Sequence, residues 1–372
     1  MTIILLLILC VYAVTIAQLI RGFGKINTYY PTYSKPQTFF AIVVPFRNER
    51  DNLPALLESF RNLNYPEDLF EIILIDDFSE DDSVRQIYNW RMENGKFQTT
   101  LLENIHLSNS PKKDAISRAI PIIKNEWIIT TDADCKVTQN WLHTLDSYIK
   151  NHDVSMIAGP VSYELKGSFL HYFQQLDLLS LQGATIGSFG MGLGFMCNGA
   201  NFAYKKSLFL ELNGFSGNQN KASGDDVFLL QKAINKHPKK VHYLKAETGI
   251  VTTKSMDGWK SLFYQRVRWA SKTTSYQSIF GKDLAVIVFF GNLTIIGAAV
   301  LLAFGLLHWI NFTLLFGMKF IVDFVLLYKT NQFLKGKMRF VLLSSLVYPF
   351  FCVSVAMYSL VGNYQWKDRN FR

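Results

Sequence analysis

Among the closely spaced aspartates of this 372-residue sequence, three pairs stand where both carboxylates could act on one ligand. The pairs are Asp76 and Asp77, Asp132 and Asp134, and Asp225 and Asp226. Two carboxylates on a tight turn can hold a hard divalent cation such as Mg²⁺ or Mn²⁺, because these ions prefer oxygen ligands. A carboxylate beside a hydroxyl can also act as a general base. The spacing therefore predicts metal-assisted or acid–base chemistry carried by aspartates.

Other side chains that commonly carry chemistry give weaker signals. The four cysteines show no C-x-x-C spacing, and the seven histidines include no i, i+4 pair beside a carboxylate. Neither a zinc site nor a disulfide framework is indicated, so carboxylates must hold any metal. Gly190, Gly192 and Gly194 lack the third glycine of a dinucleotide-binding loop and follow no apolar strand, so they predict a flexible loop.

The elements that must position these acids can be predicted from the apolar pattern. A continuous apolar run at residues 39–44 is typical of a strand buried on both faces of a parallel sheet, and residues 70–75 and 126–131 predict two further strands. Helical spacing at residues 52–63, and a polar helix at 81–94, alternate with these strands and predict a doubly wound α/β sheet. The first two acid pairs directly follow predicted strands, at the edge where open α/β sheets bind ligands. A single such pair could equally cap a helix, but two pairs favour a ligand site.

Apolar residues also gather at the two ends of the chain. An uncharged run at residues 2–20 is long enough to cross about 30 Å of hydrocarbon as a helix. Arg21 and Lys25 follow it, which predicts an uncleaved anchor with the bulk of the chain in the cytosol; a cleaved signal peptide is the alternative. Further apolar runs at about 284–307, 310–328 and 340–361 predict three C-terminal transmembrane helices.

The net charge of +9 comes largely from basic residues beside these apolar runs, as the positive-inside bias would place them. A membrane partner is therefore predicted, and no nucleic acid. Lys319 and Asp323 lie four residues apart and predict an ion pair inside the helix bundle, with a substrate-path role as the alternative. The lysine-rich loop at 329–339 suits the cytosol, so four full crossings would place the basic tail at 364–372 outside. The membrane topology of the C-terminal end stays undecided, because one of the apolar runs can instead be a re-entrant or interfacial segment.

Five short motifs occur in a characteristic order: VPFRNE at 44–49, DDFS at 76–79, DAD at 132–134, SGDDVFL at 223–229 and QRVRW at 265–269. In order and spacing they resemble the family-2 glycosyltransferases, which are inverting enzymes with the nucleotide-sugar-binding fold called GT-A. The membrane-bound branch, with cellulose, hyaluronan and chitin synthases and ceramide glucosyltransferase, is the most similar. The resemblance covers about residues 38–275 together with the flanking helices.

The resemblance implies roles for residues that match the family's motifs. Donor binding is expected from Pro45, Asn48, Glu49, Asp76, Asp77, Lys113 and Asp132. The D-x-D motif implies that Asp132 and Asp134 hold Mg²⁺ or Mn²⁺ against the diphosphate. Lys112 and Lys113 lie where the family often has a lysine near the diphosphate, but Pro111 replaces the glycine that usually precedes it, so the assignment of Lys113 departs from the pattern.

Catalysis is expected from Asp226 as the general base, beside Asp225. Asp225 replaces a commoner glutamate and is one methylene shorter, which leaves the division of roles between the two acids open. An acceptor or diphosphate role is implied for Asn201 and for Gln265, Arg268 and Trp269, since arginine can grip phosphate oxygens at two points. The mixed basic and aromatic segment around the last three is typical of an interfacial helix.

The expected organisation is an anchor at 1–22, a cytosolic GT-A catalytic domain with a doubly wound mixed sheet at 38–255, an interfacial segment at 256–282, transmembrane helices at 283–363 and a basic tail at 364–372. The resemblance implies transfer of a sugar from a nucleotide-diphosphate sugar, expected to be a UDP-sugar, to a lipid or lipid-linked acceptor. The rival enzyme hypothesis is a processive polysaccharide synthase. A rival of another class is an inactive membrane scaffold or export partner. The expected location is the plasma or inner membrane, crossed several times.

Overall fold

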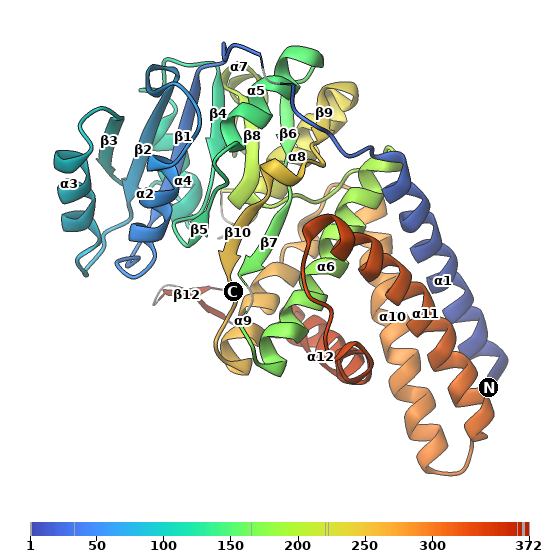
Figure 1. Cartoon of the computed structure of the whole chain (residues 1–372). Coiled ribbons are helices and arrows are strands. Elements are labelled where there is room, and N and C mark those ends of the chain that lie inside the picture. The colour runs from blue at the N-terminus through green and yellow to red at the C-terminus, as the bar shows by residue number, and fades with distance from the viewer. Residues whose placement is uncertain are drawn as a thin grey trace. The chain divides into compact units, whose positions relative to one another are not determined.

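The computed structural model describes residues 2–32, 34–164, 166–219, 221, 223–362, 364–366 and 369–371. The chain divides into two compact units, each shown with its elements in Figure 1. The α/β unit comprises Asn27–Glu164 and Met196–Lys254, and the helical unit comprises Met1–Ile26, Leu165–Phe195 and Ser255–Arg372. Residues 165–195 lie inside the expected catalytic domain in sequence but group with the helical unit. The other domain boundaries stay predictions.

The α/β unit is built on a mixed sheet. Its strands are β1 Phe40–Phe46, β2 Phe70–Asp76, β3 Gln98–Glu103, β4 Trp127–Thr130, β5 Cys135–Lys136, β6 Met156–Ala158, β7 Val161–Glu164, β8 Phe202–Lys205, β9 Val241–Tyr243 and β10 Val251–Lys254. Seven of them form one sheet in the order β3-β2-β1-β4-β8-β6-β9, and β5-β10-β7 form a second. Strands β3, β2, β1 and β4 are parallel, whereas β8 is antiparallel to both of its neighbours. The predicted mixed α/β sheet is confirmed.

The helices of the α/β unit are α2 Leu53–Arg61, α3 Ser83–Glu93, α4 Pro111–Ala119, α5 Trp141–Asn151, α7 Lys206–Glu211 and α8 Asp225–Lys236, with 3-10 turns η1 Glu67–Leu69, η2 Gly199–Asn201, η3 Pro238–Lys240 and η4 Glu247–Gly249. Helix α2 illustrates how the sequence specifies them. Leu53, Leu56, Leu57 and Phe60 recur at helical spacing and are all buried in the hydrophobic core. Pro54 lies in the first turn, where its missing N–H costs no hydrogen bond.

The register of the parallel strands determines where the first acids lie. Strand β1 pairs with β2 so that Phe46 is opposite Asp76, and with β4 so that Val43 is opposite Thr130. Because these strands are parallel, their carboxyl ends meet at one edge of the sheet. The residues after β1, β2 and β4 are therefore neighbours, as the sequence predicted.

Asp146 of α5 anchors the chain that enters β1. It is fully buried and accepts hydrogen bonds from the backbone N–H groups of Gln37 and Thr38, at 3.2 and 3.0 Å. The Thr38 hydroxyl adds a bond of 2.7 Å, and the Lys150 ammonium lies 2.8 Å from the other carboxylate oxygen. Burial alone would raise the pKa of Asp146, but the bonds from Lys150 and Thr38 outweigh it and hold the pKa below its usual value.

We expect Asp146→Asn to lower the melting temperature at pH 7 and to make its acid-side dependence on pH shallower. The folded pKa of Asp146 is depressed, so its stabilising contribution is complete above the unfolded pKa, about 3.9. That contribution is lost as pH falls through the folded pKa. Thermal unfolding of both proteins between about pH 3 and pH 7 measures the difference. An equally steep acid-side loss in the variant would contradict this account.

The described elements of the helical unit are α1 Thr2–Lys25, α6 Phe169–Gly190, α9 Trp259–Ala270, η5 Thr273–Ser275, α10 Ile279–Ala303, α11 Trp309–Leu334, α12 Val341–Val361, β11 Tyr364–Trp366 and β12 Arg369–Phe371. Within the described residues, α1, α10, α11 and α12 are long and apolar enough to cross a membrane. The predicted arrangement of one N-terminal and three C-terminal candidate helices is confirmed. In the predicted tail, residues 367, 368 and 372 lie outside the described residues.

Glycines allow α1 and α6 to pack at close range. A Cβ on Gly22 would lie 2.1 Å from the carbonyl oxygen of Gly187, and a Cβ on Gly190 would lie 1.8 Å from the carbonyl oxygen of Gly22. Small residues of this kind let helix backbones approach each other in membrane proteins. Gly190, which the sequence placed in a flexible loop, therefore ends α6 against α1.

The predicted ion pair inside the helical unit is present. The Lys319 ammonium lies 2.6 Å from Asp323 on the same helix. The Tyr12 hydroxyl of α1 donates a 2.6 Å hydrogen bond to the other oxygen of Asp323, and the Lys319 ammonium lies 4.9 Å from the centre of the Tyr12 ring. The pair therefore connects α11 to α1, as a structural ion pair would.

Candidate active site

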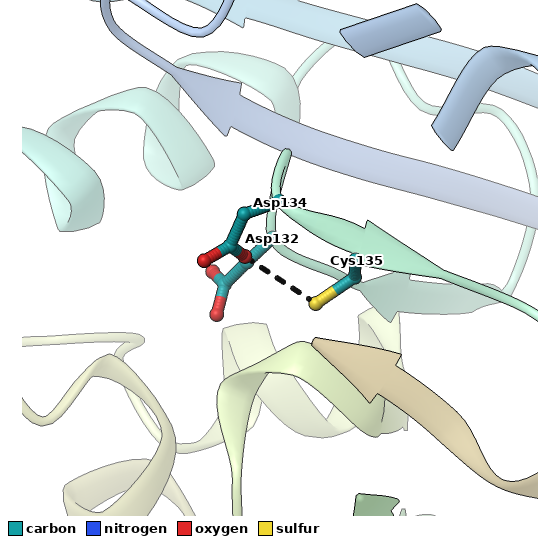
Figure 2. A group of neighbouring side chains, drawn as sticks. All are labelled: Asp132, Asp134 and Cys135. Atoms are coloured by element: carbon teal, nitrogen blue, oxygen red, sulfur yellow. Dashed lines mark hydrogen bonds between the residues drawn. The ribbon is translucent and has the colours of Figure 1, made fainter. Parts of the chain in front are cut away.

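The D-x-D motif forms a tight turn between β4 and β5. The Cys135 N–H donates to the Asp132 carbonyl at 3.1 Å, and Figure 2 shows the carboxylates of Asp132 and Asp134 beside each other, with the Cys135 thiol next to them. Ligand atoms of these three residues lie within 4.8 Å of one another. Burial raises the pKa of the Cys135 thiol well above its usual value, so the sulfur stays protonated. The two carboxylates thus provide the oxygen ligands that Mg²⁺ or Mn²⁺ requires, and the residues fit such an ion.

The third acid pair opens helix α8, after Gly224 in the left-handed region at φ 92°. Asp225 and Asp226 are both buried in its first turn, where negative charge is favourable. The Asp226 carboxylate accepts hydrogen bonds from the backbone N–H groups of Gly199 at 2.9 Å and Val227 at 2.7 Å. The Gly199 carbonyl in turn accepts a 2.9 Å bond from the Thr130 hydroxyl at the end of β4. This chain of contacts fixes the start of α8 to the strand that precedes the D-x-D turn.

One lysine joins two of the acid pairs. The Lys112 ammonium lies 2.6 Å from Asp132 and 3.3 Å from Asp225. Burial alone would lower the pKa of Lys112, but Asp132 and Asp225 together raise it well above its usual value. Of the two adjacent lysines named from the sequence, Lys113 is buried and donates to the backbone carbonyls of Asn218 and Lys221, at 2.7 and 2.8 Å. Lys112 is therefore the lysine that contacts the acids, and the donor-binding role expected for Lys113 stays a prediction.

The acids after β2 contact the neighbouring loops. Asp76 is half-buried and accepts a 3.0 Å bond from the Ser79 N–H. Asp77 is buried, and its side chain accepts bonds from Asn104 at 2.7 Å and from the His106 ring at 2.5 Å. Asp76 is therefore the more accessible member of the pair.

The loop after β1 is fixed to the loop after β2. Pro45 lies within β1, in register with Ile75. The Asn48 side chain accepts a 2.8 Å bond from the Glu80 N–H, and the Asn48 backbone N–H donates to Ser79 at 3.0 Å. Glu49 is buried and accepts a 2.5 Å bond from the Asn52 side chain. The side chains of Asn48 and Glu49 thus shape this edge of the sheet.

Asn201, expected near an acceptor, is fully engaged inside the α/β unit. Its amide donates to the carbonyls of Pro160 and Gly249, both at 2.8 Å, and accepts a 3.0 Å bond from the Trp141 indole. Gly159 leaves room for it, because a Cβ there would lie 2.4 Å from the amide nitrogen of Asn201. Buried amides that make all of these bonds position backbone. Asn201 therefore positions the backbone around it, and the acceptor role expected for it stays a prediction.

The QRVRW motif lies on α9 of the helical unit and centres on Arg266. The Arg266 side chain is buried and paired with Asp177 of α6 at 2.5 Å. It also donates to the Gln265 side chain, and its guanidinium lies 4.2 Å from the centre of the Trp269 ring. Gln265 and Trp269 are thus held by Arg266, a residue that sequence reasoning did not single out. Arg268 follows two positions later on the same helix.

The sequence signals for the residues that were missed were weak. Lys112 was visible only as one of two adjacent lysines, and no pattern decided which one faces the acids. Asn104 and His106 follow β3, whose partly exposed residues lack the continuous apolar run that revealed the other strands. Recognising β3 as a weak strand between two helical segments would have suggested Asn104 and His106. The carboxyl end of a parallel strand must lie at the same edge of the sheet as the acids.

Strand β8 carries a buried hydroxyl whose pKa responds to the Lys112–Asp225 pair. The Tyr204 side chain on β8 is 1% exposed, and its hydroxyl has no hydrogen-bond partner among the described residues. Burial raises the pKa of this phenol, Asp225 raises it further, and Lys112 opposes the change, so both charges act on the hydroxyl. Thr131 and Ser223, which precede the two acid motifs, also bury hydroxyls that no described residue bonds. These groups are available to a bound ligand or water.

We expect Tyr204→Phe to raise the melting temperature, because the variant removes a buried polar group without a partner. Such a group costs about 1–3 kcal/mol, and each kcal/mol shifts the melting temperature by about 2–4 °C in a domain of about 150–250 residues. Tyr65→Phe is the matched control, since the Tyr65 hydroxyl donates a 2.7 Å bond to the Thr38 carbonyl. That variant should lower the melting temperature, and equal shifts in the two variants would contradict the prediction.

The mixed sheet and the acids at its edge are those of the GT-A class of glycosyltransferases. Comparison with protein families agrees: residues 41–212 match the family described as Glycosyl transferase family 2, and residues 127–361 match Glycosyl transferase family group 2. The second match covers more than half of the chain. The chain therefore belongs to the family-2 glycosyltransferases.

Individual relatives are distant. The chain is 24% identical over 120 residues to poly(ribitol-phosphate) beta-N-acetylglucosaminyltransferase TarS of Staphylococcus aureus, covering 32% of this chain and 20% of that protein. It is 28% identical over 104 residues to beta-monoglucosyldiacylglycerol synthase of Trichormus variabilis, covering 28% of this chain and 22% of that protein. The chain thus spans about a fifth of the length of these curated relatives.

One solved structure is similar over nearly its whole length. The mannosyltransferase PcManGT from Pyrobaculum calidifontis, in complex with GDP-Man and Mn²⁺, has a TM-score of 0.60 at 15% sequence identity. The match covers 97% of this chain and 98% of that one. At this identity the likeness shows the fold, which includes the GT-A sheet.

Proposed function

We propose that this protein transfers a sugar from a UDP-sugar to a lipid or lipid-linked acceptor at a membrane, with inversion at the anomeric carbon. The observation that carries the proposal is the ammonium of Lys112, which contacts acids from two separate motifs, Asp132 after β4 and Asp225 at the start of α8. The carboxylates of these two motifs therefore lie close enough to contact the same bound group. A donor diphosphate and an acceptor hydroxyl need such a meeting point.

Different residues of the α/β unit bind the cation, accept the proton and bind the nucleoside. Asp132 and Asp134 would hold a divalent cation, which neutralises the negative charge that develops on the diphosphate leaving group. Asp226, held in one orientation by two backbone N–H groups, takes the proton from the acceptor hydroxyl as that oxygen attacks the sugar. Asp76 binds the nucleoside from the neighbouring strand end, supported by the loop that contains Asn48 and Glu49.

The helical unit supplies the membrane part of the proposal. Arg21, Lys25 and the lysine-rich loop at 329–339 lie beside candidate spanning helices, so the α/β unit faces the cytosol and the chain crosses the plasma or inner membrane several times. Gln265, Arg268 and Trp269 of α9 serve the diphosphate and the acceptor. Four candidate spans favour a lipid acceptor over a growing polymer, which would need a pore. The relative named as a monoglucosyldiacylglycerol synthase supports the lipid class.

A donor screen tests the reaction. The full-length protein in lipid nanodiscs is incubated with Mn²⁺ and a panel of UDP- and GDP-sugars, and nucleotide release and lipid products are followed by mass spectrometry. The proposal predicts turnover of a UDP-sugar and addition of a single sugar to lipid. Product ladders of increasing length would support a processive synthase instead. Tight, metal-dependent nucleotide binding without turnover of any donor would support an inactive scaffold.

We expect Asp134→Ala to weaken Mn²⁺-dependent binding of UDP by about 10–100-fold, a loss seen even for residues that only support a metal ligand. Asp134 is one of two carboxylates on the D-x-D turn, so its removal halves the oxygen set available to the cation. Calorimetry with UDP and Mn²⁺ measures the effect, and EDTA-treated wild type defines the metal-free baseline. An unchanged dissociation constant would remove Asp134 from the metal site.

A further inference from the structure

Lys112 occupies an unusual place for a cation, between an expected metal ligand and a catalytic acid. Its ammonium lies 2.6 Å from Asp132 and 3.3 Å from Asp225, and 17% of its side chain is exposed. Asp132 contacts it at the closer distance, although Asp225 is the more buried of the two acids. Lys112 thus forms an ion pair with Asp132, the same carboxylate that would bind a divalent cation in the proposed function.

The surroundings of Lys112 restrict where its ammonium can go. A Cβ on Gly199 would lie 3.1 Å from the Asp225 carboxylate and 3.3 Å from the Lys112 ammonium, so the backbone of η2 closes one side of the pair. The Asp225 side chain is only 10% exposed, so this carboxylate can keep the ammonium away from water when the contact with Asp132 is lost.

We propose that Lys112 is a built-in counter-ion that competes with the divalent cation for Asp132 and moves fully onto Asp225 when the cation binds. The inference rests on the proposed function, because it takes Asp132 and Asp134 as the metal ligands. A cation at that turn would repel the ammonium beside Asp132, and like charges a few ångströms apart interact strongly at a partly buried site. Asp225 is the carboxylate that the ammonium already contacts.

Two consequences follow for the chemistry of the site. Free cation binds weakly, because it must displace Lys112 from Asp132, so the cation is favoured when it arrives with the negative charge of a donor diphosphate. Once Lys112 has moved, Asp225 is neutralised by its full ion pair, and Asp226 is the acid left to accept a proton. Lys112 would thereby settle the division of roles between the two adjacent acids.

Direct metal titration tests the proposal without any measure of activity. Full-length protein in nanodiscs is titrated with Mn²⁺ alone, and free Mn²⁺ is counted by electron paramagnetic resonance. K112M removes the charge and should bind Mn²⁺ about tenfold more tightly than wild type, since a nearby positive charge no longer opposes the ion. K112R keeps the charge and should bind Mn²⁺ about as weakly as wild type. D134A and the double variant D134A/K112M should lose the site.

K112M leaves the buried Asp225 without its counter-ion, which can prevent folding. A second variant keeps the test decisive in that case. The double variant K112M/D225N removes both members of the pair and should also bind Mn²⁺ more tightly than wild type. Equal affinity of wild type, K112M and K112M/D225N, with binding still lost in D134A, would overturn the counter-ion proposal alone. Absence of Asp134-dependent Mn²⁺ binding in every variant, with and without UDP, would instead overturn the metal site of the proposed function.

Discussion

Asp226→Asn is expected to reduce sugar transfer by about 10²–10⁴-fold, the usual cost of losing a positioned base. Asparagine has nearly the same shape as aspartate but cannot take a proton from the acceptor hydroxyl. Its amide can still accept a hydrogen bond at one atom, so one of the two backbone contacts to Gly199 and Val227 is kept. Nucleotide affinity should change little, because the donor contacts come from the strand ends and the D-x-D turn.

The measurement pairs transfer rates with UDP binding in the presence of Mn²⁺. Asp225→Asn is the matched control on the adjacent residue. Because Asp225 is paired with Lys112, that variant should change metal and donor binding more than the proton-transfer step. A fully active Asp226→Asn enzyme would remove Asp226 from the role of base, and loss of UDP binding in the same variant would point to a structural defect.

The sequence predicted the sheet edge well because its signals were local. Strands β1, β2 and β4 are mostly buried and appear in the sequence as short segments rich in apolar residues. The acids that follow two of them must share an edge once the strands are parallel. The four candidate membrane helices were equally visible, since length and hydropathy decide them. These features depend on composition and order along the chain.

The features that the sequence did not reveal depend on contacts between distant segments. Whether Lys112 or Lys113 meets the acids is decided by how α4 packs on β1 and β2. The role of Asn201 depends on the carbonyls of Pro160 and Gly249, which approach it only in the folded unit. Helix α6 has polar side chains such as Gln174, Gln175 and Asp177 among its apolar residues, and its place in the helical unit becomes clear only from the partners of such polar groups.

The ion pair between Asp177 and Arg266 shows how such a distant contact supports the helical unit. Both side chains are buried, with 6% and 5% exposed, and the carboxylate lies 2.5 Å from the guanidinium. The same guanidinium contacts Gln265 and lies over the Trp269 ring. The pair therefore fixes two residues of the QRVRW motif against α6. Its two charges come from segments that are 89 positions apart.

Asp177→Ala should destabilise the protein by about 3–5 kcal/mol, because it leaves the buried Arg266 charge without a partner. Denaturant unfolding followed by tryptophan fluorescence measures the loss. The double variant Asp177→Leu with Arg266→Met is the control, since replacing a buried pair by apolar side chains of similar volume is often neutral or stabilising. The two results together separate the cost of an unpaired charge from the cost of lost packing. If the double variant is as unstable as Asp177→Ala, packing rather than charge holds α9 against α6, and the motif is positioned by shape alone.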